Sequence, residues 1–215
     1  MPLQIISPSN NVVEIDAIRN MYVRGAVPND FVSGGGYSVT GWSTGVIAAS
    51  LASTSVLVAL RFSTGAATGK NAYLTRLRFQ FSPVTVGASA GVPGTLAWQR
   101  FDAGPYAGGN SRLTAVFRKH AGVGGVTEMA DIRDSNAALT TGSGPVLGTE
   151  ILSGTHIPNS TGPMILEWVV DQDDMGGIPA RLAAGQGLAL VSKVAFPGTM
   201  TWMYSYTAHW YESTK

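Results

Sequence analysis

Near the end of the chain, over residues 199–212, two kinds of side chain alternate strictly. Every second position is aromatic or small: Trp202, Tyr204, Tyr206, Ala208 and Trp210. The positions between them are Thr201, Met203, Ser205, Thr207, His209 and Tyr211. A period of two places successive side chains on opposite sides of an extended backbone. The segment is therefore predicted to be a long β-strand that buries its rings. Its second face is neither strongly charged nor fully apolar, so it suits contact with loops or another subunit.

Similar patterns predict a series of shorter strands before this one. They are expected at residues 21–24, 37–40, 45–49, 56–63, 73–82, 95–102, 112–119, 146–152, 164–171 and 187–194. Alternation places Tyr73, Leu77, Phe79 and Phe81 on one face of residues 73–82, and Leu113, Ala115 and Phe117 on one face of residues 112–119. In residues 164–171, Met164, Leu166, Trp168 and Val170 share a face. Such strands, with one buried and one wetter face, are typical of antiparallel sheets.

Glycine and proline are dense between the predicted strands, and the chain holds 27 Gly and 11 Pro. These residues favour turns over helices. Only residues 13–20 and 178–184 show a short helical pattern. We therefore expect an all-β fold, a two-sheet antiparallel β-sandwich of the jelly-roll or Greek-key type, formed as one domain by residues 21–215.

The first twenty residues are predicted to be a separate segment. They contain Pro2 and Pro8 and several apolar residues, among them Leu3, Ile5 and Ile6. Two interpretations are equally consistent with this pattern: a first strand of the fold, or an extended N-terminal arm that docks on a neighbouring subunit.

Composition favours a protein that works inside an assembly. Apolar residues make up 45% of the chain, charged residues only 13%, and the net charge is +1, whereas about a quarter of residues are charged in an average protein. A surface with few charges costs little to desolvate against another protein, and the balanced charge gives no reason to expect nucleic acid or an anionic membrane as partner. The chain has no cysteine, and no secretory signal or membrane-spanning run is recognisable. We expect a soluble protein made in the cytoplasm.

No motif makes a strong case for catalysis, a metal or a cofactor. Residues 87–91 fit the G-x-S-x-G pattern of a nucleophile elbow, but a strand-like run follows where a helix is needed. Asp171, Asp173 and Asp174 resemble the start of a calcium loop, but its twelfth position is Leu182 in place of glutamate. They remain only a weak candidate for a cation site. The sequence thus predicts no enzyme and no cofactor.

The end of the chain resembles the C-terminal hairpin of small virion proteins of tailed bacteriophages. The resemblance covers about the last thirty residues: Gly187–Leu190, a turn at Pro197 and Gly198, and a closing strand from Thr201 and Trp202 to Trp210, Tyr211 and Glu212. It implies a β-sandwich that sits on a capsid as a cement or decoration protein, as a trimer in many relatives. It implies no catalytic residues.

We therefore expect a capsid cement or decoration protein located on the capsid surface of a virion and made in the host cytoplasm. Its partners would be the major capsid protein and copies of itself, as a homotrimer, without a membrane and without direct contact to nucleic acid. Two alternatives stay open. One is a receptor- or carbohydrate-binding module of a phage tail or fibre, in which exposed rings such as Trp42 or Tyr106 stack on sugars. The other is a single jelly-roll protein that itself forms the shell.

These hypotheses assign roles to particular residues. The core anchors are expected to be Trp168, Trp202, Tyr204, Tyr206 and Trp210. The interface candidates are Leu3, Ile5, Ile6, His209 and Tyr211.

Overall fold

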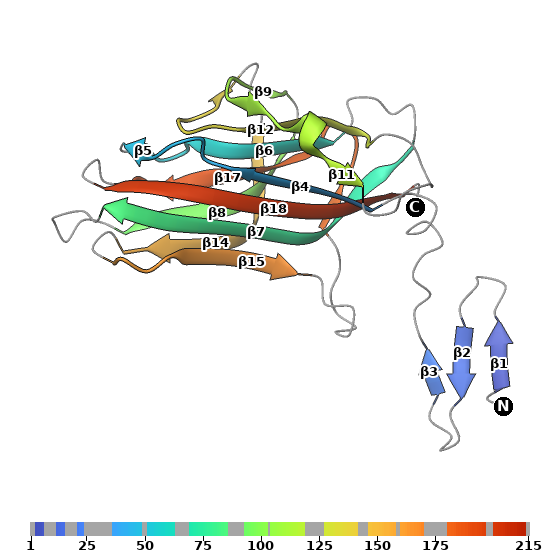
Figure 1. Ribbon diagram of the computed structural model, residues 1–215. Coiled ribbons are helices and arrows are strands. Elements are labelled where there is room, and N and C mark those ends of the chain that lie inside the picture. Colours follow the sequence, from blue (N-terminus) through green and yellow to red (C-terminus); the bar gives the residue numbers. More distant parts are fainter. Residues whose placement is uncertain are drawn as a thin grey trace.

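The protein is an antiparallel β-sandwich of two stacked sheets (Figure 1). Its structure, a computed structural model, describes residues 3–6, 12–15, 21–23, 36–48, 51–62, 69–85, 93–102, 104–118, 127–141, 146–157, 160–169, 180–196 and 200–213. Among these residues the only helix is a single 3₁₀ turn at Leu113–Ala115. The prediction of an all-β sandwich is therefore confirmed.

One sheet has seven strands and the other has six. The seven-stranded sheet runs in the order β11 (Phe117–Arg118), β4 (Gly36–Trp42), β18 (Thr201–Ser213), β7 (Asn71–Thr85) and β15 (Met164–Val169), with β5 (Ile47–Ala48) paired to β18 and β16 (Ala180–Leu182) paired to β7. The six-stranded sheet runs β10 (Asn110–Ser111), β12 (Met129–Asp134), β6 (Val56–Phe62), β17 (Gly187–Val194), β8 (Gly94–Asp102) and β14 (Val146–His156). A small sheet pairs β9 (Tyr106–Ala107) with β13 (Thr140–Thr141).

The main strands pair in a nested order. Taken along the chain they are β4, β6, β7, β8, β14, β15, β17 and β18. The first pairs with the last, β4 with β18, and the next pairs inward are β6 with β17, β7 with β15, and β8 with β14. Each pair is antiparallel, so the chain follows the path of one long hairpin wrapped into two layers. The strands β9 to β13 lie between β8 and β14, at the tip of that hairpin.

The core lies between the two sheets and is rich in rings. All five predicted inward residues of β18 are at most 3% exposed. Trp202 stacks on Phe81 with ring centroids 4.7 Å apart, and Tyr204 stacks on Phe79 at 5.7 Å. The predicted anchors Trp202, Tyr204, Tyr206 and Trp210 all belong to the core cluster, and Trp168 is partly buried against it. Because removing a buried ring costs about 3–5 kcal/mol, this face of β18 stabilises the whole sandwich.

Three of the predicted elements are wrong. Residues 112–119 contain the 3₁₀ turn and the two-residue β11, and Phe117 is 68% exposed instead of sharing a buried face. In place of the short helix predicted at 178–184, residues 180–182 form strand β16, in which Ala180 and Leu182 are buried while Arg181 is exposed. The helix predicted at 13–20 is likewise a strand over residues 13–15, within β2 (Val12–Ile15).

The face predicted for Tyr73 is also wrong. The register between β7 and β18 shifts between His209 and Trp210, which pair with Arg76 and Leu74. A shift of this kind moves the following residues to the opposite face. Leu74 is therefore buried in the core, while Tyr73 lies on the other side and stacks on Tyr211 with centroids 4.9 Å apart.

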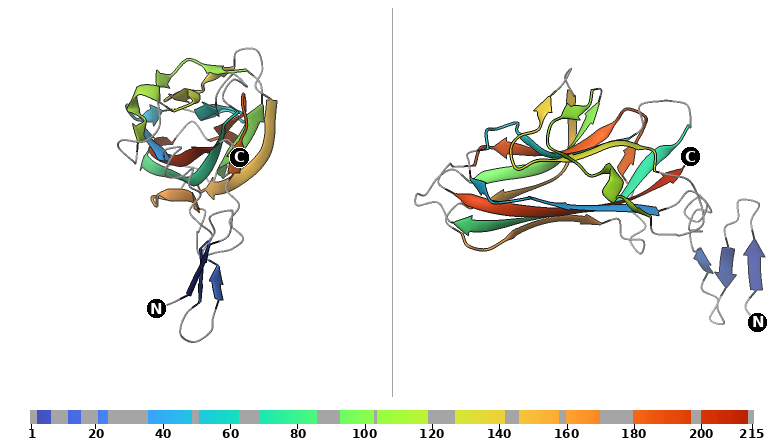
Figure 2. Two further views of the ribbon diagram at one scale, coloured as in Figure 1. Left: turned by 90° about the vertical axis from the view of Figure 1, so that its right-hand side faces the viewer. Right: turned by 45° about the horizontal axis from the view of Figure 1, so that its top comes forward.

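The N-terminal segment forms a sheet of its own. Strands β1 (Leu3–Ile6), β2 (Val12–Ile15) and β3 (Met21–Val23) pair in the order β1-β2-β3, and all pairs are antiparallel. In Figures 1 and 2 these strands lie beside the sandwich and belong to neither of its two sheets. The sheet extends to Val23, so it crosses the boundary predicted at residue 20.

Candidate functional site

We call the solvent side of the seven-stranded sheet the outer face. Register places its residues in three rows that cross the strands. The rows are Phe117-Ser38-His209-Arg76-Val169, Thr40-Thr207-Arg78-Glu167 and Trp42-Ser205-Gln80-Ile165. Neighbouring strands lie about 4.8 Å apart, so five strands give a surface roughly 20 Å across.

The outer face is polar in the middle and apolar towards its edges. Five of the eight large apolar residues exposed in the described part of the chain lie on it: Trp42, Phe117, Ile165, Val169 and Met203. Between them stand mainly hydroxyl and amide side chains, and Thr40 and Thr207 lie within hydrogen-bonding distance at 3.4 Å. Scattered apolar residues are normal on a protein surface, but aromatic residues and methionine next to uncharged polar groups are typical of binding surfaces.

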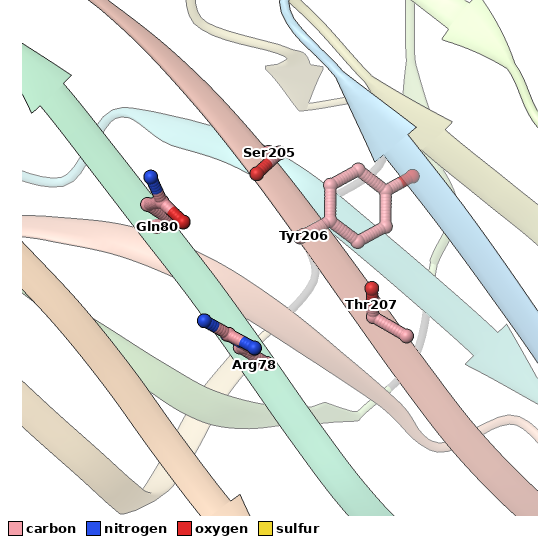
Figure 3. A pocket seen from close by; sticks show the side chains of 5 residues that line it. All are labelled: Arg78, Gln80, Ser205, Tyr206 and Thr207. Carbon is pink, nitrogen blue, oxygen red and sulfur yellow. The ribbon is translucent and has the colours of Figure 1, made fainter.

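A shallow hollow of about 230 Å³ lies in the middle of this face. Figure 3 shows the side chains of Arg78 and Gln80 from β7 and those of Ser205 and Thr207 from β18 around it. Tyr206 also contributes to the lining, but its ring belongs to the core. The hollow is therefore bounded by one guanidinium, one amide and two hydroxyl groups.

Two of the groups around the hollow are available for a ligand. Within the part of the chain that the structure describes, neither Arg78 nor Ser205 has a side-chain hydrogen bond or an ion pair. Glu167 lies opposite Arg78 in the register, but its carboxylate accepts a hydrogen bond from Arg76 Nε at 2.9 Å and a second bond from Arg76 Nη2. Because the Glu167 carboxylate forms its ion pair with Arg76, Arg78 has no ion-pair partner among the described residues.

A buried charged cluster lies beneath the outer face, between the two sheets. Asp134, at the end of β12, is completely buried and accepts a hydrogen bond from Arg112 Nε at 2.7 Å. Tyr206 OH donates to the same oxygen at 3.2 Å, and Asn110 Nδ2 donates to the other carboxylate oxygen at 3.3 Å. A buried carboxylate with these partners ties β18 to the six-stranded sheet.

The cluster shifts the ionisation of its neighbours. Burial raises the pKa of Tyr206 and that of Tyr204 far above the ordinary value, and the nearby negative charge of Asp134 is the second cause. Both phenols therefore stay protonated. The hydrogen bond to Asp134 raises the pKa of Arg112. Tyr204 OH donates to the carbonyl of Ser135 at 2.9 Å. These two tyrosines therefore act as hydrogen-bond donors in the core.

Gly41 allows the cluster to form. A Cβ atom at this position would lie 2.3 Å from the ring of Tyr206 and 2.6 Å from Asp134 Oδ2. Such distances are far inside normal contact, so a larger residue here would push the phenol and the carboxylate apart.

Arg112 connects the buried cluster to Trp42 on the outer face. Its Nη2 donates to the backbone carbonyl of Trp42 at 3.1 Å, and its guanidinium carbon lies 5.2 Å from the centre of the Trp42 ring. This geometry is a cation–π contact. Trp42 remains 54% exposed. Arg112 therefore fixes the position of the Trp42 ring, while much of the ring surface stays exposed to solvent.

The two interface candidates near the C-terminus lie on the outer face. His209 and Tyr211 are half-buried on β18, and Tyr211 stacks on Tyr73. Both residues make contacts of their own within the chain. Their role at an interface stays a prediction, as does that of Leu3, Ile5 and Ile6 in β1.

Of the two rings proposed for sugar stacking, only Trp42 is exposed. Tyr106 is 3% exposed and packs edge-on against Phe101, with ring centroids 5.0 Å apart. The expectation that the Tyr106 ring is exposed is therefore wrong, because the ring packs with Phe101 and Ala189 of the six-stranded sheet in a second core cluster.

A second buried carboxylate belongs to the C-terminal end of β18. Glu212 Oε1 accepts hydrogen bonds from Thr127 Oγ1 at 2.6 Å and from Trp210 Nε1 at 3.1 Å, and Glu128 N donates to it at 3.0 Å. Burial raises the pKa of Glu212 in spite of these bonds. The carboxylate joins the end of β18 to the start of β12 and plays a structural part.

Two motifs considered for chemistry lie outside the described residues. These are Asp171, Asp173 and Asp174 and the serine motif at 87–91. Among the residues that are described, no group of three or more His, Asp or Glu is arranged to hold a metal ion. In the same residues, no helix has the length and apolarity needed to cross a bilayer.

No family model matches the chain, and no curated protein matches its sequence. The function must therefore be argued from the chain itself.

Proposed function

We propose that this protein is a structural component of a virion, of the capsid cement or decoration kind, that attaches to a protein lattice as a homo-oligomer. The nested strand pairing supports this class of protein. Each sheet holds four of the eight main strands, and the first of these strands pairs with the last and each following pair lies further inward. We infer from this order a jelly roll, a fold that serves in viral capsid proteins and lectins. The fold limits the classes of protein to which the chain can belong, but it does not determine the function of the protein.

The observation that carries the proposal is the separate N-terminal sheet. The register places six residues at positions that share one of its faces, and all six are apolar: Leu3, Ile5, Val13, Ile15, Met21 and Val23. An apolar face of this kind is stabilised when it packs against another apolar surface and is removed from water. We infer that this surface belongs to a neighbouring subunit, since the sheet pairs with neither sheet of the sandwich. A terminal element that packs on a neighbour is what a cement protein requires.

The low charge of the chain supports the same role. Only 13% of the residues are charged, so large parts of the surface can be covered by protein without desolvating many ions. In this proposal the protein has no catalytic role and needs no cofactor.

A pair of substitutions in β1 tests the proposal. Ile5→Lys places a charge on the apolar face of the N-terminal sheet, whereas Gln4→Lys, one residue away, places the same charge on the other face opposite Glu14. We expect Ile5→Lys to reduce the oligomer to monomers in sedimentation velocity and to abolish occupancy on purified particles. Gln4→Lys should leave both unchanged, and both variants should keep the circular-dichroism spectrum of the sandwich.

Two outcomes would count against the proposal. Full occupancy of the Ile5→Lys variant on particles would refute attachment through this sheet. Assembly of the purified chain alone into closed shells would favour the alternative of a single jelly-roll shell protein.

A further inference from the structure

The hollow on the outer face combines polar groups with a held aromatic ring. Trp42 and Ser205 are direct cross-strand partners, and so are Ser205 and Gln80. Adjacent strands are about 4.8 Å apart, so the Trp42 strand lies roughly 10 Å from the Gln80 strand. The ring and the far side of the hollow are thus within reach of one small, extended ligand.

The hydrogen-bonding groups of the hollow suit a ligand rich in hydroxyl groups. Gln80 Nε2 donates to Ser82 Oγ at 3.3 Å, which leaves its amide oxygen as an acceptor. Ser205, without a side-chain partner among the described residues, can both donate and accept. Among the described residues, the Thr207 hydroxyl has one hydrogen-bond partner, Thr40 Oγ1 at 3.4 Å.

The ring of Trp42 adds a flat apolar platform beside these groups. The contact with Arg112 and, through it, with Asp134 fixes the position of the ring before any ligand arrives. Fixing a binding group in advance lowers the entropy cost of binding. An aromatic platform next to hydroxyl and amide groups matches a pyranose ring, which has an apolar C–H face and polar edges.

Arg78 adds one unpaired positive charge. A guanidinium with no carboxylate of its own is well shaped to bind a carboxylate through two parallel hydrogen bonds. With a volume of about 230 Å³, the hollow is smaller than the ~300–1,000 Å³ of pockets that enclose a whole small molecule. It accommodates one ring or one charged group of a longer chain.

Other ligand classes fit these features less well. Nucleic acid needs several unpaired basic groups in a row, and here Arg76, the other arginine of the three rows, is neutralised by Glu167. A peptide that adds as a strand needs a free sheet edge, whereas β18 and β7 are paired on both sides over this region.

We infer that Trp42 and the hollow formed by Arg78, Gln80, Ser205 and Thr207 bind a saccharide that carries a carboxylate. A sugar ring lies on Trp42, hydroxyl groups bond to Gln80 and Ser205, and the carboxylate pairs with Arg78. This is a binding activity in addition to the proposed attachment through the N-terminal sheet, and it uses a different surface.

The experiment uses the full chain on an array of uronic-acid and sialic-acid glycans together with neutral ones. The glycan that binds best is then titrated by calorimetry beside its carboxyl-reduced counterpart. Trp42→Ala is paired with Phe117→Ala, which removes another exposed ring from the same face, and Arg78→Gln is paired with Arg181→Gln, which removes an exposed charge from β16.

We expect the array to show acidic glycans bound in preference to neutral ones. Trp42→Ala should weaken binding about tenfold, as loss of a stacking ring predicts, and Phe117→Ala less than about twofold. Arg78→Gln should remove the preference for the acidic glycan over its reduced form, and Arg181→Gln should keep it.

The inference is wrong if no acidic glycan binds, or if each variant binds like its control. It is also wrong if the array is empty while Trp42→Ala and Arg78→Gln prevent attachment to particles, because the face would then be a protein interface. Ile5→Lys should leave glycan binding unchanged, so failure of the proposed attachment and failure of this inference are distinguishable.

Discussion

The two faces of β18 lie on one backbone but differ in their surroundings, since one is buried in the core and the other faces solvent. The inner face carries Trp202, Tyr204, Tyr206, Ala208 and Trp210, all buried against the second sheet. The outer face carries hydroxyl groups, Met203, His209 and Tyr211, which are exposed or half-buried. Stability thus depends mainly on the inner side. Substitutions on the two sides should therefore differ sharply in their cost.

The largest effect is expected beneath the strand, at the buried cluster. Asp134→Ala removes the carboxylate that pairs with Arg112 and accepts from Tyr206. Breaking a buried pair in this way costs about 3–5 kcal/mol because a charge is left without a partner. Denaturant unfolding measures the loss. Asp131→Ala, on the same strand, removes a partly exposed partner of Arg133 and should cost less than about 1 kcal/mol; equal losses for the two variants would contradict the account.

The next effect is steric and acts on the same cluster. Gly41→Ala places a methyl group 2.3 Å from the Tyr206 ring, and overpacking of this kind costs about 1–3 kcal/mol. Gly45→Ala is the control, since the nearest atom to its added carbon, Asn136 Nδ2, is 3.8 Å away. Thermal unfolding should show a lower Tm for the first variant alone. Equal Tm values would mean that the inner face tolerates more volume than the packing indicates.

A third test uses pH at the end of the strand. The folded state holds the proton of Glu212 more tightly than the unfolded chain, because burial raises the pKa of this group above 4.5. Its contribution to stability is therefore complete below about pH 4.5 and is lost as the pH rises through the raised pKa of the folded state. Glu212→Gln should flatten this decline in Tm.

The control for this test is Glu167→Gln, which changes a partly exposed carboxylate on the outer face. It should retain the decline seen in the unchanged protein. A decline of the same size in Glu212→Gln would show that another group causes it.

The smallest effect on stability is expected on the outer face itself. Ser205→Ala changes an exposed hydroxyl without a side-chain partner in the described residues and should alter the free energy of unfolding by less than about 0.5 kcal/mol. The same change should weaken glycan binding. A loss of stability above about 1 kcal/mol would show that the outer face also supports the fold.

The sequence predicts the regular strands well because their alternation is local. Residues 199–212 and 164–171 follow a period of two without interruption, and residues 201–212 and 164–169 are strands with the predicted faces. The pattern fails where the register shifts. One shift moves Tyr73 to the outer face, and no local signal marks that position.

The buried cluster around Asp134 could not be predicted from the sequence either, and the reason is a different one. Strand β12 carries Asp134 at a buried position and has a register shift near Met129, so its pattern is not that of an amphipathic strand and the strand was not predicted. The partners of Asp134 come from distant parts of the chain, and Tyr206 is 72 residues away. Only the folded pairing brings them together. The exposure of Trp42 was predicted, but its place in one row with Ser205 and Gln80, and the lack of an ion-pair partner for Arg78 among the described residues, follow only from the strand register.

The most direct measurement for the central claim is low-resolution imaging of intact particles that contain this chain. The account predicts density for the sandwich at regular, symmetry-related positions on the capsid surface, with the N-terminal sheet turned towards the neighbouring subunits. Density confined to a tail or fibre, or scattered without symmetry over the particle, would contradict it.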